Sequence, residues 1–236
     1  MDMTTAAVPH SLAHLTPLLP APPARILEAG CGRGALAAAL AELGYRVTGV
    51  DRDAEVAAAA GARGVPVIHA DVLDVSGEHD VVLFTRSLHH AEDLDGVLAH
   101  AASLLAPDGR VVVEEFAWER VDRAAADFLY DNRALLVAAG LLDADAPSGD
   151  LLDDWVTGHD SLHTGSAVLA ALDRVGSDPT TAATPVLWRL LNGRGGAWTE
   201  QVTAVPGVLD AVRRAEERRI AAGTLPAVGF VASVRR

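Results

Sequence analysis

Lysine is absent from this chain. All 19 basic residues are arginine, so the sequence offers no amine for a Schiff base, a lysine general base or a lysine-containing phosphate loop. Cysteine occurs once, at Cys31, which excludes internal disulfides and zinc clusters built from several cysteines.

Long apolar runs are also missing. No run approaches about 18 residues, and the first residues lack a basic region followed by an apolar stretch. We therefore expect a cytoplasmic protein with no membrane partner. The formal net charge of −13 predicts no nucleic-acid partner, because nucleic-acid binding needs a basic face.

The most informative motif is residues 25–36, Arg-Ile-Leu-Glu-Ala-Gly-Cys-Gly-Arg-Gly-Ala-Leu. It predicts a buried strand, a glycine turn and a helix that begins near Ala35, so that the backbone can approach a polar ligand closely. The glycine spacing also fits the dinucleotide-binding pattern. However, Glu28 precedes the first glycine, and a carboxylate there would repel pyrophosphate. It suits a ligand with a positive group, such as the amino group and sulfonium of S-adenosylmethionine.

Strands and helices alternate through the first half of the chain. The pattern predicts an α/β fold, a Rossmann-like doubly wound sheet of seven mostly parallel strands. The predicted strands are 26–28, 46–51, 65–71, 80–84, 110–115, 198–205 and 228–234.

The chain length predicts a single domain, 1–236. Residues 118–196 are too long for a plain crossover. Residues 120–140 predict one long helix, and residues 141–196 mix helical patches with glycine, proline, serine and threonine. We expect this region to form a helical substrate cap, inserted after the fifth strand.

Three acidic residues fall at the ends of predicted strands, namely Glu28, Asp51 and Asp71. Ligands of open α/β sheets bind beyond the carboxyl ends of the strands. Asp51 follows the glycine turn by about 20 residues, the usual place for an acid that binds ribose hydroxyls. Asp71 can accept a hydrogen bond from an adenine amino group. Each acid alone could be a helix cap, but together they indicate a nucleoside site.

These features resemble the class I S-adenosylmethionine-dependent methyltransferases, in particular the bacterial members that act on small molecules. The resemblance covers residues 24–117 well and the last strand loosely. The segments that carry it are Leu-Glu-Ala-Gly-Cys-Gly-Arg-Gly at 27–34, Val-Asp at 50–51, Ala-Asp-Val at 70–72, Phe-Thr-Arg-Ser-Leu-His-His at 84–90 and Leu-Leu-Ala-Pro-Asp-Gly-Arg-Val-Val-Val at 104–113.

The resemblance implies S-adenosyl-L-methionine as the cofactor. Glu28 and Gly30 would hold its methionine amino group, Asp51 its ribose, and Asp71 with the Val72 N–H its adenine edge. The full set of implied cofactor-binding residues is Glu28, Gly30, Cys31, Gly32, Asp51, Arg52, Asp71, Val72, Thr85 and Arg86.

Thr85 and Arg86 would lie near the methionine moiety of the cofactor. Arg52 departs from the family pattern, in which an apolar residue commonly packs against adenine; an arginine could stack there or point to solvent.

The candidates for acid–base catalysis are His89, His90 and His163. His89 and His90 follow the fourth strand, whose end should point at the transferred methyl, and His163 lies in the predicted cap. Histidine can accept a proton near neutral pH, although each could instead serve packing or capping. His159 and His163 share a helix face if their segment is helical, but we predict no metal site.

Two further groups belong to the predicted acceptor side. Glu114 and Glu115 end the fifth strand, and we expect one to face the pocket and the other to be exposed to solvent. A set of aromatic residues could form an apolar wall or simply core: Trp118, Tyr130, Trp155 and Trp188.

The sequence thus predicts transfer of a methyl group from S-adenosylmethionine to an N, O, S or C atom of a small-molecule acceptor by in-line displacement. An NAD-dependent oxidoreductase is disfavoured, because it would want an apolar residue at position 28 and a tyrosine–lysine dyad. A non-methylating S-adenosylmethionine-binding protein, either a cyclase or a regulatory subunit, remains the alternative. A homodimer is left open.

Overall fold

The computed structural model describes residues 3–147, 149–193, 196–199 and 205–236. The chain divides into two compact units. The sheet unit comprises Thr4–Glu115, His163–Ala182 and Val231–Arg236, and the second unit comprises Met1–Met3, Phe116–Leu162 and Ala183–Phe230. The chain therefore passes several times from one unit to the other.

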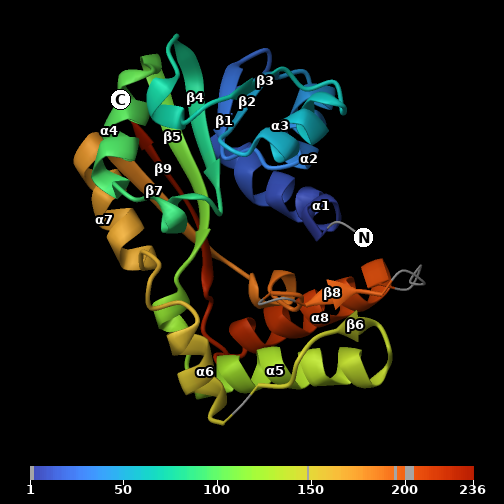
Figure 1. The fold of residues 1–236 in the computed structure, drawn as a ribbon. Helices are drawn as coiled ribbons and strands as arrows, with labels where there is room; N and C mark the ends of the chain where they lie inside the picture. The colour runs from blue at the N-terminus through green and yellow to red at the C-terminus, as the bar shows by residue number, and fades with distance from the viewer. Residues whose placement is uncertain (1–2, 148, 194–195, 200–204) are drawn as a thin grey trace. The chain divides into compact units, whose positions relative to one another are not determined.

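A seven-stranded sheet forms the centre of the sheet unit, as Figure 1 shows. Its order is β3-β2-β1-β4-β5-β9-β7, and the pairs β3–β2, β2–β1, β1–β4 and β4–β5 are parallel. The strands are β1 Arg25–Ala29, β2 Arg46–Asp51, β3 Val67–His69, β4 His79–Thr85, β5 Leu105–Phe116, β7 Ser177–Thr184 and β9 Gly229–Arg235. The predicted fold class is confirmed.

The order of the strands fixes where a ligand can bind. The chain adds β2 and β3 on one side of β1 and then returns to place β4 on the other side. Such a reversal leaves a crevice beyond the carboxyl ends of the two strands that flank it, because their connections run to opposite faces of the sheet. The ends of β1, β2 and β4 therefore frame the candidate site.

Helices cover both faces of this sheet. Figure 1 shows α1–α3 on one side and α4 with α7 on the other. Leu15, Leu36 and Leu40 pack with Ile26 and Val81 of the sheet in a core of buried apolar side chains. The helices are α1 Met3–Leu15, α2 Ala35–Glu42, α3 Ala54–Gly61, α4 Leu94–Ser103 and α7 Gly165–Val175, with short 3-10 turns η1 Thr16–Leu18, η2 Val72–Asp74 and η3 Leu88–His90.

The second unit is mainly helical. Its elements are η4 Trp118–Arg120, α5 Arg123–Ala138, β6 Leu142–Asp143, α6 Leu151–Thr157, η5 Leu187–Arg189, β8 Ala197–Trp198 and α8 Val205–Ala221. The fully buried carboxylate of Glu216 accepts hydrogen bonds from the N–H groups of Val186, Leu187 and Trp188, at 2.8–2.9 Å. These bonds satisfy the first N–H groups of η5 and so attach it to α8.

One prediction about the second half of the chain needs correction. Residues 198–205 do not add a strand to the main sheet, because Ala197–Trp198 pairs antiparallel with Leu142–Asp143 in a separate two-stranded sheet; residues 200–204 lie outside the described residues. The sheet instead takes β7, Ser177–Thr184. This edge strand is exposed at all but its last residue and contains Pro179, so its sequence carries no apolar alternation.

The region predicted as a cap, 118–196, does not fall into one unit. Residues 163–182, with α7 and most of β7, belong to the sheet unit, and the rest of the described region belongs to the second unit. The role of this region as a substrate cap stays a prediction.

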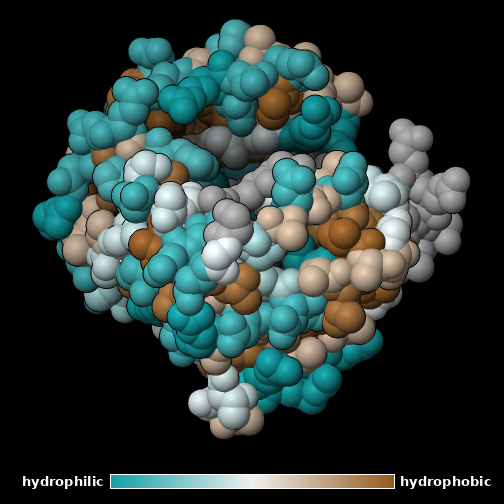
Figure 2. Space-filling view, turned by 60° about the horizontal axis from the view of Figure 1, so that its bottom comes forward, coloured by the Kyte–Doolittle hydropathy of each residue, from teal (hydrophilic) through white to brown (hydrophobic). Residues whose placement is uncertain are grey.

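The surface carries small apolar groups between hydrophilic ones on the face that Figure 2 presents. The large hydrophobic side chains that are exposed include Leu135 at 69% and Val156 at 42%. Within the described parts of the chain, every helix is too short or too polar to cross a bilayer.

Candidate functional site

The glycine turn follows β1 and brings the backbone close to β2 and to the end of β4. Gly30 and Gly34 have φ of +74° and +72°, and a Cβ added to Gly30 would lie 2.8 Å from the Cβ of Ser87. The N–H groups of Gly30 and Cys31 both donate to the carbonyl of Val50, at 2.8 and 3.0 Å. Glycine is required here because an L side chain would be strained and would also collide with the segment after β4.

Glu28 is buried beneath this turn, with 1% of its surface exposed. The Thr85 hydroxyl donates to its Oε1 at 3.3 Å, whereas Oε2 has no hydrogen-bond partner among the described residues. Burial raises the pKa of Glu28 to about 8, and the Thr85 hydroxyl opposes the shift only in part. A cationic group beside Oε2 would satisfy the carboxylate, so the residue suits a ligand with an ammonium group.

Asp51 ends β2 and is held in place by backbone groups. Its Oδ2 accepts a hydrogen bond from the N–H of Gly32 at 2.9 Å, and its Oδ1 accepts one from the N–H of Asp53 at 3.0 Å. Each carboxylate oxygen keeps a further lone pair. The carboxylate is therefore oriented before any ligand arrives and can still accept hydrogen bonds from one.

Asp71 begins the short turn η2. Its Oδ1 accepts from the N–H of Leu73 at 2.9 Å, so the side chain does cap a helical turn, as one of the two sequence interpretations held. It also lines the cavity described next, together with Val72. Asp71 can cap η2 and also accept a hydrogen bond from a ligand in the cavity, because the cap uses only one of its two carboxylate oxygens.

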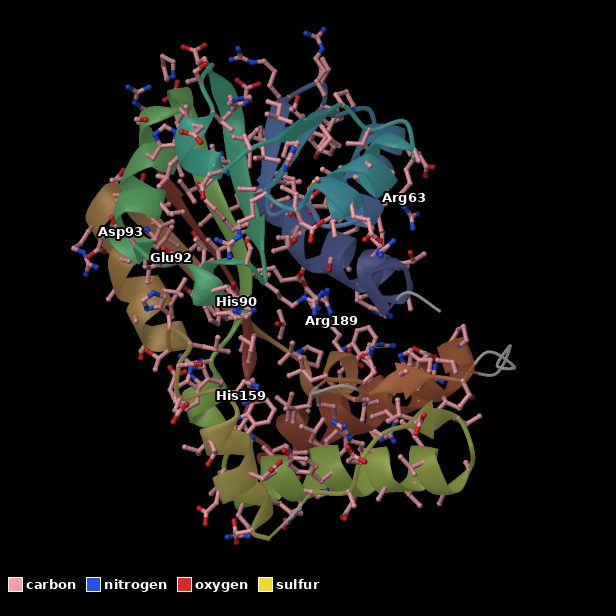
Figure 3. The ribbon with its side chains drawn as sticks, viewed as in Figure 1. Arg63, His90, Glu92, Asp93, His159 and Arg189 are labelled. Atoms are coloured by element: carbon pink, nitrogen blue, oxygen red, sulfur yellow. The ribbon has the colours of Figure 1, made fainter. Side chains whose placement is uncertain are left out.

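A cavity of about 450 Å³ lies beyond the strand ends, within the sheet unit. It is bordered by the glycine turn, the end of β2, the turn η2 and the segment between β4 and α4; Figure 3 shows His90, Glu92 and Asp93 in that last segment. The predicted cofactor residues that line it are Gly30, Asp51, Arg52, Asp71, Val72 and Arg86. The predicted residues that do not line it are Glu28, Cys31, Gly32 and Thr85.

Cys31 is a structural residue of the turn. Its sulfur is buried next to β2, because a Cβ on Gly49 would lie 2.6 Å from the Cys31 Sγ. Burial raises the pKa of the thiol to about 12. The thiolate, the nucleophilic form of cysteine, is therefore suppressed at neutral pH.

Both carboxylates at the end of β5 are buried, which corrects the expectation that one is exposed to solvent. The Ser11 hydroxyl of α1 donates to the Glu114 carboxylate, with its oxygen 2.8 Å from Oε2 and 3.1 Å from Oε1. Glu115 accepts from the N–H groups of Leu88 and His89 and from the His89 ring, whose Nδ1 lies 2.8 Å from Oε2. Strand ends beside a crevice bury such groups when neighbouring segments bring donors to them.

The predicted catalytic histidines take three different positions. His90 is exposed and lines the cavity, and partial burial together with His89 lowers its pKa. His89 is 7% exposed and is paired with Glu115, with its ring centroid 4.1 Å from that of His90. His163 donates from Nε2 to the carbonyl of Ala91 at 2.8 Å.

His159 and the aromatic residues belong to the second unit. The His159 ring stacks on Trp155 at 3.8 Å between centroids, and its Nδ1 lies 2.7 Å from the Trp155 carbonyl. Trp155 and Trp188 are 2% exposed, so they are core residues. No group of three histidine, cysteine, aspartate or glutamate side chains suited to a metal ion occurs in the parts of the chain that the structure describes.

Two residues of this region escaped the sequence analysis. Ser11 supplies the hydroxyl on Glu114, and Ser87 donates to the carbonyl of Ala29 at 3.1 Å, linking the ends of β4 and β1. A lone serine carries no spacing signal. Only the position of Ser87 directly after the Thr85-Arg86 pair marked it as part of the site.

Known proteins are similar to this chain in sequence and in fold. A family model described as a methyltransferase domain matches residues 5–152, more than half of the chain. This chain belongs to the methyltransferase-domain family. An uncharacterized methyltransferase of Mycobacterium bovis is 35% identical over 123 residues, which make up 49% of this chain and 62% of that relative. The chain thus spans less than two thirds of that relative's length.

Solved methyltransferase structures share the fold of this family member. An S-adenosylmethionine-dependent methyltransferase of Mesorhizobium loti matches with a TM-score of 0.58 and 19% identity, over 98% of both chains. The geranyl diphosphate C-methyltransferase of Streptomyces coelicolor A3(2) matches with a TM-score of 0.59 and 16% identity, over 99% of this chain and 79% of that one. At such identities the likeness concerns the fold.

The buried Glu28 predicts a pH-dependent stability. Its folded-state pKa of about 8 lies above the reference value of 4.5, so between these pH values the carboxyl ionises in the unfolded chain but stays protonated in the folded protein. The free energy of unfolding therefore falls as the pH rises from 4.5 to 8. We expect Glu28→Gln to raise the melting temperature, relative to the parent, by on the order of 5–10 °C more at pH 9 than at pH 5. Differential scanning calorimetry without ligand measures this difference. The exposed Glu55→Gln serves as the control, and a pH-independent effect of Glu28→Gln would contradict the assigned pKa.

Proposed function

We propose that this methyltransferase-family chain binds S-adenosylmethionine in the cavity beyond β1, β2 and β4 and transfers its methyl group to a small-molecule acceptor. Glu28 carries the proposal. It is a 1% exposed carboxyl group, and its Oε2 has no partner among the described residues. Glu28 does not itself line the cavity but directly precedes the lining residues Ala29 and Gly30, so the proposal requires the ammonium group to reach it at the glycine turn. An ammonium group would supply that partner and stabilise the ionised carboxylate, whereas a pyrophosphate would disfavour its ionisation.

The residues present fit this cofactor. Glu28 would take the methionine amino group and Asp51 the ribose hydroxyls, since the Asp51 carboxylate lines the cavity with its orientation already fixed. Asp71 and the Val72 N–H would take the adenine edge, and Arg86 lines the same cavity. When bound, S-adenosylmethionine supplies a methyl group on a sulfonium, which is already a good leaving group.

The chain's own part in the reaction is positioning and exclusion of water. In-line attack forms one bond to the methyl carbon while the bond from that carbon to sulfur breaks, and this needs alignment more than acid–base help. Where the attacking N, O or S atom carries a proton, a base must accept it. His90 suits this role best among the three predicted histidines, because it lines the cavity and its lowered pKa keeps it neutral near pH 7.

The acceptor is proposed to be a small molecule, methylated at N, O, S or C. The net charge of −13 supports a partner other than nucleic acid. The solved relative from Streptomyces coelicolor acts on geranyl diphosphate, which shows that this fold can serve a small substrate. A binding protein that uses S-adenosylmethionine without methyl transfer is the alternative, and the absence of labelled product with every acceptor would favour it.

The first test concerns the choice of ligand. We expect titration calorimetry to show binding of S-adenosylhomocysteine and no binding of NAD at the same concentration. At pH 7 the complex should release a proton from Glu28, because a neighbouring ammonium lowers the pKa of that carboxyl, and Glu28→Gln should abolish the release. Comparing buffers of different ionisation enthalpy measures the proton. Preferred binding of NAD would refute the proposal.

Asp51 provides the second test. Asp51→Ala should weaken S-adenosylhomocysteine binding roughly ten- to a hundredfold, because charge-assisted hydrogen bonds to the ribose are lost. Asp53→Asn is the matched control, since Asp53 accepts from Glu55 and Val56 at the start of α3 and does not line the cavity. Circular dichroism would confirm that both variants fold. Equal affinity of Asp51→Ala and the parent would place the ribose elsewhere.

His90 provides the third test, once isotopically labelled S-adenosylmethionine has identified an acceptor. If the acceptor loses a proton to His90, His90→Gln should lower kcat by about 10²- to 10⁴-fold. The pH profile of kcat should then lose its acidic limb, which in the parent reflects the pKa of His90, lowered by burial and by the neighbouring His89. His14→Gln on α1 is the control. Full activity of His90→Gln would leave the histidine a lining residue only.

A further inference from the structure

One wall of the cofactor cavity is the short segment between β4 and α4. Leu88, His90 and Ala91 of this segment line the cavity, and η3 forms its first turn. Such a segment has few backbone hydrogen bonds of its own: His90 N–H donates to the Ser87 carbonyl at 3.2 Å and Ala91 N–H to the Leu88 carbonyl at 3.0 Å. Its conformation must therefore be fixed from outside.

Glu115 fixes the amide side of the segment. Its Oε1 accepts from the N–H groups of Leu88 and His89, at 2.9 and 3.4 Å, and its Oε2 accepts from the His89 ring. The carboxylate is fully buried, so these bonds are shielded from water.

His163 fixes the carbonyl side. Its N–H donates to the His89 carbonyl at 3.1 Å, and its Nε2 donates to the Ala91 carbonyl at 2.8 Å. A carbonyl can only accept, so Nε2 must carry the proton in both the neutral and the cationic form of this ring. The ring nitrogen that points at the segment is therefore not available to accept a proton from an acceptor.

The residues that follow His163 form α7, which is itself packed in the sheet unit. α7 packs against η3 and α4, and Arg174 of α7 forms an ion pair with Asp95 of α4. His163 lies outside residues 5–152, where the family model matches. This contact with the cavity wall is thus supplied by a part of the chain that the family pattern does not describe.

We propose that His163 is a positioning residue for the cofactor cavity, which holds the segment 88–91 in its binding conformation through the bond from Nε2 to the Ala91 carbonyl. The proposal rests on the proposed function, since it concerns the wall of the cofactor site. If the bond is lost, the segment also populates other conformations. The measured affinity then falls in proportion to the fraction of molecules that keep the binding conformation.

Three substitutions of His163 separate this role from that of a base. A glutamine side chain can place its amide N–H where Nε2 lies, an asparagine is too short, and neither accepts a proton. By calorimetry we expect His163→Ala and His163→Asn to bind S-adenosylhomocysteine about three- to tenfold more weakly than the parent, and His163→Gln to bind within twofold of it. Arg174→Ala, which removes only the surface ion pair of α7, should also stay within twofold.

Turnover adds a readout that tests the base directly. If His163 positions the segment, His163→Gln keeps the parent's kcat and pH profile; if His163 is the base, kcat falls about 10²- to 10⁴-fold with unchanged cofactor affinity. The proposal is overturned by that second result, by unchanged affinity in His163→Ala, or by equal loss in the glutamine and asparagine variants.

Hydrogen exchange without ligand keeps this test apart from the proposed function. A peptide that spans residues 88–92 should exchange faster in His163→Ala than in the parent, and at the parent's rate in His163→Gln. If the parent fails to bind S-adenosylhomocysteine, the proposed function fails, while this exchange pattern still decides whether His163 holds the segment. Equal exchange rates in His163→Ala and the parent would refute the proposal that His163 holds the segment 88–91.

Discussion

Three buried carboxylates at the ends of β1 and β5 impose the main constraint on this molecule, because each needs hydrogen-bond donors that water cannot supply. Glu28 of β1 accepts a hydrogen bond from the Thr85 hydroxyl of β4, and Glu114 of β5 accepts one from the Ser11 hydroxyl of α1. Glu115 receives the amides at the start of η3. The donors thus attach α1, the end of β4 and η3 around one crevice. One oxygen, Oε2 of Glu28, has no donor among the described residues.

The sequence predicted the sheet and the glycine turn because both depend on local signals. Buried parallel strands such as β4 are continuous apolar runs, and the glycines at 30 and 34 are demanded by positive φ and close approach. Asp51 and Asp71 could be placed because strand ends in a parallel sheet meet at one edge. The strand β7 could not, since an exposed edge strand has no apolar face to reveal it.

The hydrogen bonds between residues distant in the chain could not be predicted from the sequence for a different reason. Ser11 with Glu114 and His163 with Ala91 join positions far apart in the chain, and neither pair has a fixed spacing that sequence alone could expose. The expectation that one of Glu114 and Glu115 faces solvent failed on the same ground. Strand alternation predicts opposite faces, but it does not predict that α1 and η3 each bury one of them.

The path of the chain explains why two residues, Glu115 and His163, hold the cavity wall at 88–91. Glu115 is the last residue of the sheet unit before the chain enters residues 116–162, and His163 is the first residue on its return. Both residues bond to the segment 88–91 directly, so the segment is held at the two points where the chain leaves and re-enters this unit. A change at either residue would therefore act directly on the wall of the cavity.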